Sequence, residues 1–182
     1  MSAENFYRQI ESVNNTARPV ESWNPPLIGD MDCCIKRDGS WLLDGRPLSN
    51  EKMLRLFSTV LKKEGEEYFL VTPVEKWRIE VEDLPFLVVE LEIDKRGSDD
   101  QVIRARTNVG DWVRVDTSHP LCSSPISAID EMQAIPYVLI RNGLGARFNR
   151  NCFLQLAELL EPLGKEGPYK IISANNEFVL SL

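Results

Sequence analysis

Two stretches of the chain, far apart in the sequence, share one layout. Residues 68–81 read YFLVTPVEKWRIEV and residues 169–182 read YKIISANNEFVLSL. They align without a gap, and each has a short apolar run, a polar turn and a second run that begins with an aromatic residue. Such a pattern is typical of two strands joined by a tight turn. The recurrence predicts that the chain contains a duplicated unit.

Each of these strand pairs follows a hairpin signal and a capped helix. In the first unit Asp38-Gly39 separates two strand-like runs, which predicts a type I′ turn. Ser49 is expected to cap a helix over residues 50–64, which has Leu56 on its apolar face and ends at Gly65.

The second unit repeats this order. Asn142-Gly143 predicts another type I′ turn, and Asn149 or Asn151 is expected to cap a helix that runs through about Glu161. The order strand, strand, helix, strand, strand (ββαββ) therefore occurs twice.

These patterns predict an α+β fold built from two related units, each an antiparallel sheet with a helix. Residues 1–30 are expected to form a helix, over residues 3–13, and a proline-rich linker. The first ββαββ domain is predicted over residues 31–82 and a larger C-terminal domain over residues 83–182. The larger domain contains a meander at 83–116 and the second ββαββ unit at 136–182, with 117–133 left unassigned.

Composition limits the classes of function. The chain has 182 residues, 43% of them hydrophobic, and a net charge of -7, which argues against bulk binding to DNA. No apolar run is long enough to span a bilayer, and the N-terminus does not resemble a signal peptide, so a cytoplasmic protein is expected. The four cysteines include no C-x-x-C pair, and neither a metal nor a cofactor is predicted.

Standard catalytic motifs are absent, and no catalytic residue is assigned. His119 is the sole histidine. It is either a general base that needs a carboxylate from another segment, such as Glu75 or Asp83, or a loop residue that hydrogen-bonds before Pro120. An enzyme is therefore the less favoured class.

Positive charge gathers in the second hairpin, where Arg141, Arg147 and Arg150 fall close together in an acidic chain. Arginine binds phosphate or carboxylate with two parallel hydrogen bonds, so these residues are candidate anion ligands. The alternative is that they pair with neighbouring acids on the surface. Glu75 and Lys76, in the turn of the first repeated stretch, either contact a ligand or pair with surface charges.

Several strings resemble a bacterial family of uncharacterised proteins, domain of unknown function 1285. They include RDGSW at 37–41, YFLVTPVEK at 68–76, EDLPF at 82–86 and TNVGD at 107–111. The resemblance covers residues 32–156, and the string at 68–76 is its most specific part. It implies two related domains, the C-terminal one pleckstrin-homology-like, with a nucleotide-like or nucleic-acid-derived ligand in a cleft between them and a signalling role.

The leading hypothesis is a non-enzymatic, regulatory protein that binds a small ligand. The arginines would hold its anionic group, Trp41 or Trp112 would stack on a base, and Thr107 or Asn108 would read the edge of that base. A hydrolase that uses His119 and a protein-interaction adaptor are the alternatives. The sequence leaves the oligomeric state open.

Overall fold

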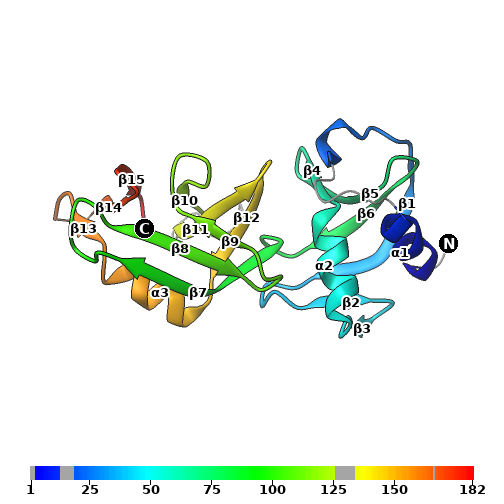
Figure 1. Ribbon diagram of the computed structural model, residues 1–182, viewed down its shortest axis with the longest axis horizontal. Coiled ribbons are helices and arrows are strands. Elements are labelled where there is room, and N and C mark those ends of the chain that lie inside the picture. Colours follow the sequence, from blue (N-terminus) through cyan, green and yellow to red (C-terminus); the bar gives the residue numbers. More distant parts are fainter. Residues whose placement is uncertain (1–2, 13–18, 126–133, 166) are drawn as a thin grey trace. The chain divides into compact units, whose positions relative to one another are not determined.

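The computed structural model describes residues 3–12, 19–125, 134–165 and 167–182, and it divides the chain into two compact units (Figure 1). The first unit spans Met1–Glu82 and the second spans Asp83–Leu182. Each unit contains a sheet of six strands and a helix, so the predicted α+β class is confirmed. No helix in the described ranges is long and apolar enough to cross a membrane.

The first unit is organised around a sheet with the strand order β3-β2-β1-β6-β5-β4. Its strands are β1 (Leu27–Ile35), β2 (Trp41–Leu43), β3 (Arg46–Pro47), β4 (Leu61–Glu64), β5 (Glu67–Val71) and β6 (Lys76–Val81). The hairpin predicted over residues 68–81 is confirmed, because β5 and β6 pair antiparallel. However, β1 and β6 pair in parallel, so the prediction of a purely antiparallel sheet is wrong. This pairing joins strands that are distant in the sequence, which local patterns do not reveal.

Two turns differ from the expectation. The hairpin at Asp38-Gly39 forms, but only Gly39 has a positive φ, of 82°, and its N–H donates to the carbonyl of Lys36. A type I turn followed by a left-handed glycine replaces the expected type I′ turn. A type I′ turn occurs instead at Asp44-Gly45, with φ values of 48° and 70°, and it leads into β3, which the sequence did not predict.

Both main helices are shorter than predicted. Helix α2 spans Glu51–Thr59 and is capped by Asn50, whose side chain accepts a hydrogen bond from the N–H of Met53. The residues expected in its last turn form β4, because Leu61 pairs with Leu70 in the sheet. Gly65 therefore lies in the β4–β5 turn and does not cap the helix.

The N-terminal helix forms as predicted, with α1 at Ala3–Ser12, while Val13 and Ser2 lie outside the described residues. Phe6 and Ile10 on α1 are fully buried, and the ring of Phe6 meets that of Phe57 on α2 edge to face, 5.7 Å between centroids. The segment that follows is less regular, with a short helix η1 at Val20–Ser22, but β1 begins within the predicted linker at Leu27.

The second unit contains a sheet with the strand order β10-β11-β12-β7-β8-β9. Its strands are β7 (Phe86–Asp94), β8 (Val102–Thr107), β9 (Trp112–Arg114), β10 (Leu121–Pro125), β11 (Ala134–Arg141) and β12 (Leu144–Phe148). The meander of β7, β8 and β9 is confirmed, and so is the type I′ turn at Asn142-Gly143, with φ values of 40° and 77°. Helix α3 (Arg150–Ala157) is capped by Asn149 and ends before the predicted Glu161.

The last strands of the two units pair differently. Strands β13 (Glu161–Pro162), β14 (Tyr169–Ser173) and β15 (Asn176–Leu180) form a separate antiparallel sheet. In the first unit the corresponding strands, β5 and β6, belong to the main sheet, and β6 forms its parallel pair with β1. In the second unit the parallel pair of the main sheet is formed by β12 and β7 instead. The order of elements recurs along the chain, but the strand pairing does not.

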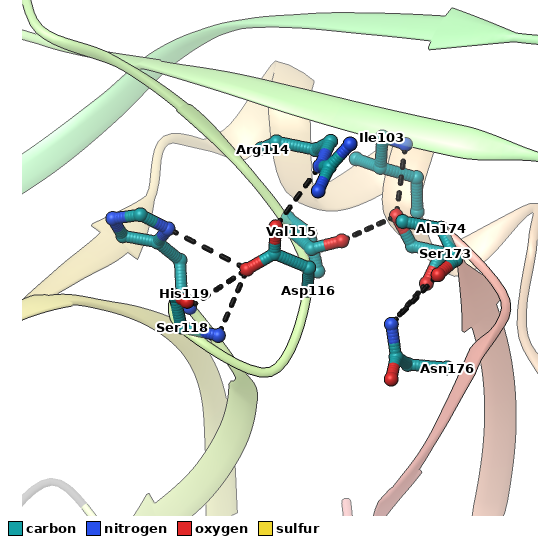
Figure 2. A network of polar contacts seen from close by, with 9 residues as sticks. All are labelled: Ile103, Arg114, Val115, Asp116, Ser118, His119, Ser173, Ala174 and Asn176. Atoms are coloured by element: carbon teal, nitrogen blue, oxygen red, sulfur yellow. Dashed lines mark hydrogen bonds and ion pairs between the residues drawn. The ribbon is translucent and has the colours of Figure 1, made fainter.

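Ser173 joins the small sheet to the meander (Figure 2). Its fully buried hydroxyl accepts a hydrogen bond of 3.0 Å from the N–H of Ile103 and donates one of 2.7 Å to the carbonyl of Val115. At the aligned position of the first unit, the hydroxyl of Thr72 instead accepts from the N–H of Glu75 within its own turn.

We expect Ser173→Ala to lower the free energy of unfolding of the second unit by about 1–3 kcal/mol, because two buried backbone groups lose their partner. Ser98→Ala, which removes an exposed hydroxyl, is the matched control and should change stability by less than about 0.5 kcal/mol. Denaturant unfolding of both variants measures the difference. Equal stability of the two variants would show that Ser173 does not hold the two sheets together.

Candidate functional site

Arg147, one of the three hairpin arginines, is committed to a buried ion pair. The whole residue is 6% exposed, and its guanidinium donates to both carboxylate oxygens of Asp83, at 2.7 and 2.9 Å. A third hydrogen bond runs to the carbonyl of Ile135, and the guanidinium lies over the ring of Tyr137. The donors of Arg147 are therefore directed at protein groups. The acid that binds Arg147 is buried and distant in the sequence, unlike the surface pairing considered as the alternative.

Arg141 lies toward the opposite face of the same sheet. Arg147 pairs across the strands with Tyr137 and Leu87, so these side chains share one face. Phe86, the neighbour of Leu87, points to the other face because side chains alternate along a strand. The guanidinium of Arg141 lies 5.4 Å from the ring centroid of Phe86.

Arg150 is exposed and is the first residue of α3. The structure thus places the three arginines in three different environments, although they are close in the sequence. Proximity along the chain did not indicate which face of the sheet each one would occupy.

Three other candidates have structural roles. Trp41 is 2% exposed in the core of the first unit, so neither face of its ring is open for stacking. Thr107 is buried, and its hydroxyl accepts from the N–H of Asp111 in the β8–β9 turn. The side-chain oxygen of Asn108 accepts from the N–H of Leu87, which ties that turn to β7.

Glu75 and Lys76 also differ from a pair of surface charges. Glu75 is buried, whereas Lys76 binds Glu64 and lies over the ring of Phe69, 4.7 Å from its centroid. Lys62 contacts the same Glu64 carboxylate at 3.2 Å. The pKa of Glu64 is lowered, first by the hydrogen bond from Lys76, so the ion pair is a stabilising feature of the first unit.

His119 lies in a tight turn with Asp116, which brings these two residues together (Figure 2). The backbone N–H of His119 donates to the Asp116 carboxylate at 3.2 Å, and its ring Nδ1 is 3.7 Å from the same oxygen. The carboxylate beside the histidine thus comes from its own loop, although an extended chain would have kept the two apart. Asp83, a partner considered from the sequence, is bound to Arg147.

Asp116 has a pKa below its ordinary value. Partial burial acts to raise that pKa, but the hydrogen bonds from Arg114, Ser118 and His119 outweigh it. A lowered pKa in the folded state stabilises the protein above the unfolded pKa, and this contribution disappears as the pH falls through the folded pKa.

We therefore expect Asp116→Asn to be less stable than the wild type at neutral pH, with a difference that shrinks as the pH falls below about 4. Denaturant unfolding of both proteins across this range measures the difference. A gap that is constant with pH would show that the charge on Asp116 does not stabilise the fold.

An exposed cluster on the meander meets the requirements of a binding surface better than the hairpin does. We call it the arginine–tryptophan face, and it consists of Arg104 and Arg106 on β8 and Trp112 and Arg114 on β9. Arg106 lies directly opposite Trp112, and Arg104 lies directly opposite Arg114. Since residues two apart on a strand share a face, all four side chains project from one side of the sheet.

The members of this face are open to solvent. Trp112 is 43% exposed, and the side chains of Arg104, Arg106 and Arg114 are 40%, 47% and 60% exposed. Each arginine contacts a carboxylate: Arg106 contacts Glu90 at 3.0 Å, Arg104 contacts Asp94 at 2.6 Å, and Arg114 contacts Asp116 at 2.9 Å. The pairs of Arg104 and Arg106 are exposed on both sides and contribute about 0–1 kcal/mol each, so an incoming anion can compete for these two arginines at low cost. The carboxylate of Asp116, which binds Arg114, is only 14% exposed.

Of the four, the sequence singled out Trp112 alone. The alternation of arginines with Ile103, Ala105 and Thr107 was a sufficient signal for an exposed arginine face, and Trp112 and Arg114 have the same spacing. Among the described residues, no group of three or more His, Cys, Asp or Glu side chains is placed to hold a metal ion.

Comparisons with known proteins identify the family. Residues 18–84 match the model of the N-terminal domain of unknown function DUF1285, and residues 85–180 match the C-terminal domain of the same family. A search of curated proteins finds no match.

Two crystal structures of DUF1285 family proteins are similar to this chain. The one from Silicibacter pomeroyi DSS-3 is 36% identical, with 95% of this chain and 91% of that chain covered and a TM-score of 0.81. The one from Shewanella baltica OS155 is 28% identical, with 70% of this chain and 91% of that chain covered and a TM-score of 0.54. Both family models and the structural matches agree with the resemblance found in the sequence, and the chain belongs to the DUF1285 family.

Proposed function

We propose that this chain is a non-catalytic, regulatory binding protein, and that its arginine–tryptophan face holds a nucleotide-like or nucleic-acid-derived ligand. The observation that carries the proposal is the position of Trp112, exposed on an open sheet face between arginines. An exposed indole stacks on any nucleobase, and such stacking contributes about 1–3 kcal/mol per base. Arginines on either side of the indole then lie within reach of the phosphates of that nucleotide.

The pairing of Arg104 with Arg114 supports an anionic ligand. Like charges directly opposite each other on neighbouring strands are destabilising. Asp94 and Asp116 offset part of this repulsion from either side. A phosphate bound between the two guanidinium groups would offset it more completely, because arginine forms charge-assisted, two-pronged hydrogen bonds with phosphate.

Calorimetric titration of the full chain with ATP, AMP and a short single-stranded RNA tests the proposal. Trp112→Ala should weaken binding about 5–150-fold, which is the loss of one stacked base. Arg114→Gln should weaken the binding of ATP, which carries three phosphates, more than that of AMP. Arg55→Gln, which removes an exposed arginine from α2, controls for the change in net charge and should bind as the wild type does.

Two results would contradict the proposal. The first is the absence of binding by any of the three ligands. The second is binding that survives Trp112→Ala but is lost in Arg141→Ala, which would assign the ligand to the β11–β12 hairpin.

A hydrolase is the second candidate, and the contact between Asp116 and His119 is the observation in its favour. A carboxylate that hydrogen-bonds to Nδ1 of a histidine orients the ring for general-base catalysis, and a small shift from the present 3.7 Å would form that bond. Hydrolysis of p-nitrophenyl esters and phosphates that disappears in His119→Ala would support this function, and equal rates in the two proteins would refute it.

The finer fold assignment belongs to the same proposal. The family resemblance supports a pleckstrin-homology-like architecture for residues 83–182 and a common ββαββ ancestor for both units. The recurring order of hairpin, helix and strands along the chain supports the ancestor. Superposing each unit separately on pleckstrin-homology domains, and then on the other unit, tests both statements.

A further inference from the structure

The first unit has an open strand edge at the beginning of β1. Strand β6 pairs with β1 from Leu27 to Ile35, with two irregularities in the register, but β2 reaches only Cys33–Ile35. Toward the start of β1, one more hydrogen bond is made on the β2 side, from the N–H of Asp44 to the carbonyl of Asp32. In the described chain no strand therefore borders residues 27–31 on the side away from β6.

One end of this edge is apolar. Leu27 is 42% exposed, Ile28 is 51% exposed, and Val74 in the neighbouring β5–β6 turn is 66% exposed. Within the described part of the first unit, these are the exposed large hydrophobic residues, and they lie at one end of the sheet, where Leu27 pairs with Lys76. An exposed strand edge with apolar side chains is a template for pairing with another chain.

The other end of the edge is acidic. Asp30 and Asp32 are exposed and line a pocket of about 470 Å³, to which Glu80 also contributes. The one cation in its lining, Arg78, is already bound by two carboxylates, Asp30 at 3.1 Å and Glu67 at 2.8 Å. The lining therefore keeps a net negative charge.

The pocket arises from an irregularity in the strand pairing. Asp30 pairs with Arg78 and Cys34 with Glu80, so β1 places three residues where β6 places one. The extra residues bulge out of the ladder, and bulges of this kind re-aim side chains at the edge of a sheet.

We infer that the open edge of β1 receives an extended segment of another protein as an added strand. The added strand carries apolar side chains at the end that contacts Leu27 and Ile28. It carries lysine or arginine side chains at the other end, which contacts Asp30 and Asp32. Backbone hydrogen bonds along the edge supply affinity, while the apolar contacts and the complementary charge select the segment.

The same charges argue against a second copy of this chain as the occupant. Two copies joined edge to edge would place Asp30 and Asp32 of both copies along one short seam. Like charges across paired strands are destabilising, so acidic residues on an edge discourage self-pairing.

Selection from a phage-displayed library of random peptides on the full chain tests the inference. We expect the enriched peptides to combine apolar residues at one end with lysine or arginine at the other. Ile28→Gln and Asp32→Lys should each weaken their binding about tenfold, the effect of losing one central contact. Leu154→Gln on α3, where the side chain is 53% exposed, is the matched control and should bind as the wild type does.

Hydrogen exchange distinguishes an added strand from a side-chain contact. A bound peptide of the enriched class should slow exchange of the amides in residues 27–31. The inference is overturned if no peptide is enriched over the Asp32→Lys variant, if the enriched peptides lack basic residues, or if these amides exchange at an unchanged rate. A wild-type dimer in sedimentation that Ile28→Gln dissociates would assign the edge to a second copy instead, and would equally overturn it.

Discussion

Replacing Asp83 with alanine is expected to destabilise the second unit by about 3–5 kcal/mol, one of the two largest effects predicted for this chain. Asp83 and Arg147 are 5% and 8% exposed as side chains, and they share two short hydrogen bonds. Without the carboxylate, the guanidinium remains buried with only the carbonyl of Ile135 and the ring of Tyr137 as partners. An uncompensated buried charge of this kind is expensive, which is the reason for the large effect.

Hydrogen exchange is the suitable measurement, because it reports the stability of each unit separately. Protection should fall in β7, β11 and β12 and remain unchanged in the first unit. The double variant Asp83→Leu with Arg147→Met should recover most of the loss, since an apolar pair of similar volume avoids the buried charge.

The matched control for this prediction is Asp94→Ala, which breaks the exposed pair with Arg104 and should cost about 1 kcal/mol or less. A loss in Asp83→Ala no larger than the loss in Asp94→Ala would mean that the Arg147 pair is not a structural centre of the second unit.

Phe57→Ala is expected to destabilise the first unit by about 3–5 kcal/mol. Phe57 is fully buried on α2, and its ring meets that of Phe6 edge to face. The truncation leaves a cavity beneath both helices and removes the contact that holds α1. Leu56, which the sequence placed on the buried face, is only half-buried, so Leu56→Ala should cost less.

A double-mutant cycle of Phe6→Ala and Phe57→Ala isolates the contribution of the ring pair. We expect a coupling energy of about 0.5–1.5 kcal/mol, and we expect Phe6→Ala alone to release α1 to rapid hydrogen exchange. Additive losses, with α1 still protected, would show that the helix is held by other contacts.

The sequence predicted most elements of the fold because their signals are local. The hairpins at Asp38-Gly39 and Asn142-Gly143, the helix cap at residue 149, and the meander after residue 83 depend on neighbouring residues. The cap of α2 was predicted one residue too early, at Ser49, whereas Asn50 caps the helix. The parallel pairs β1–β6 and β7–β12 depend on contacts between distant segments, and no local pattern indicated them. For the same reason the helix predicted to reach Gly65 ends at Thr59, because pairing of β4 with β5 outweighs helix propensity.

The candidate site was harder to predict than the fold. Arg147 resembles a free anion ligand in the sequence, but its partner Asp83 lies far away along the chain, and only the structure shows the pair. Conversely, the arginines of β8 follow the ordinary alternation of exposed and buried side chains in a strand. Only the pairing with β9 shows that Trp112 and Arg114 lie beside them. Closeness of the arginines in the sequence did not indicate which of them share a face of the sheet. The period-2 alternation along β8 and β9 did indicate it.

The binding proposal depends on Trp112 more than on any other residue. Its most direct test is the dissociation constant of the preferred nucleotide for the wild type, Trp112→Phe and Trp112→Ala, measured side by side. The account predicts nearly wild-type affinity for Trp112→Phe, which keeps an aromatic face, and a loss of about 1–3 kcal/mol for Trp112→Ala. Equal affinity of all three proteins would contradict it.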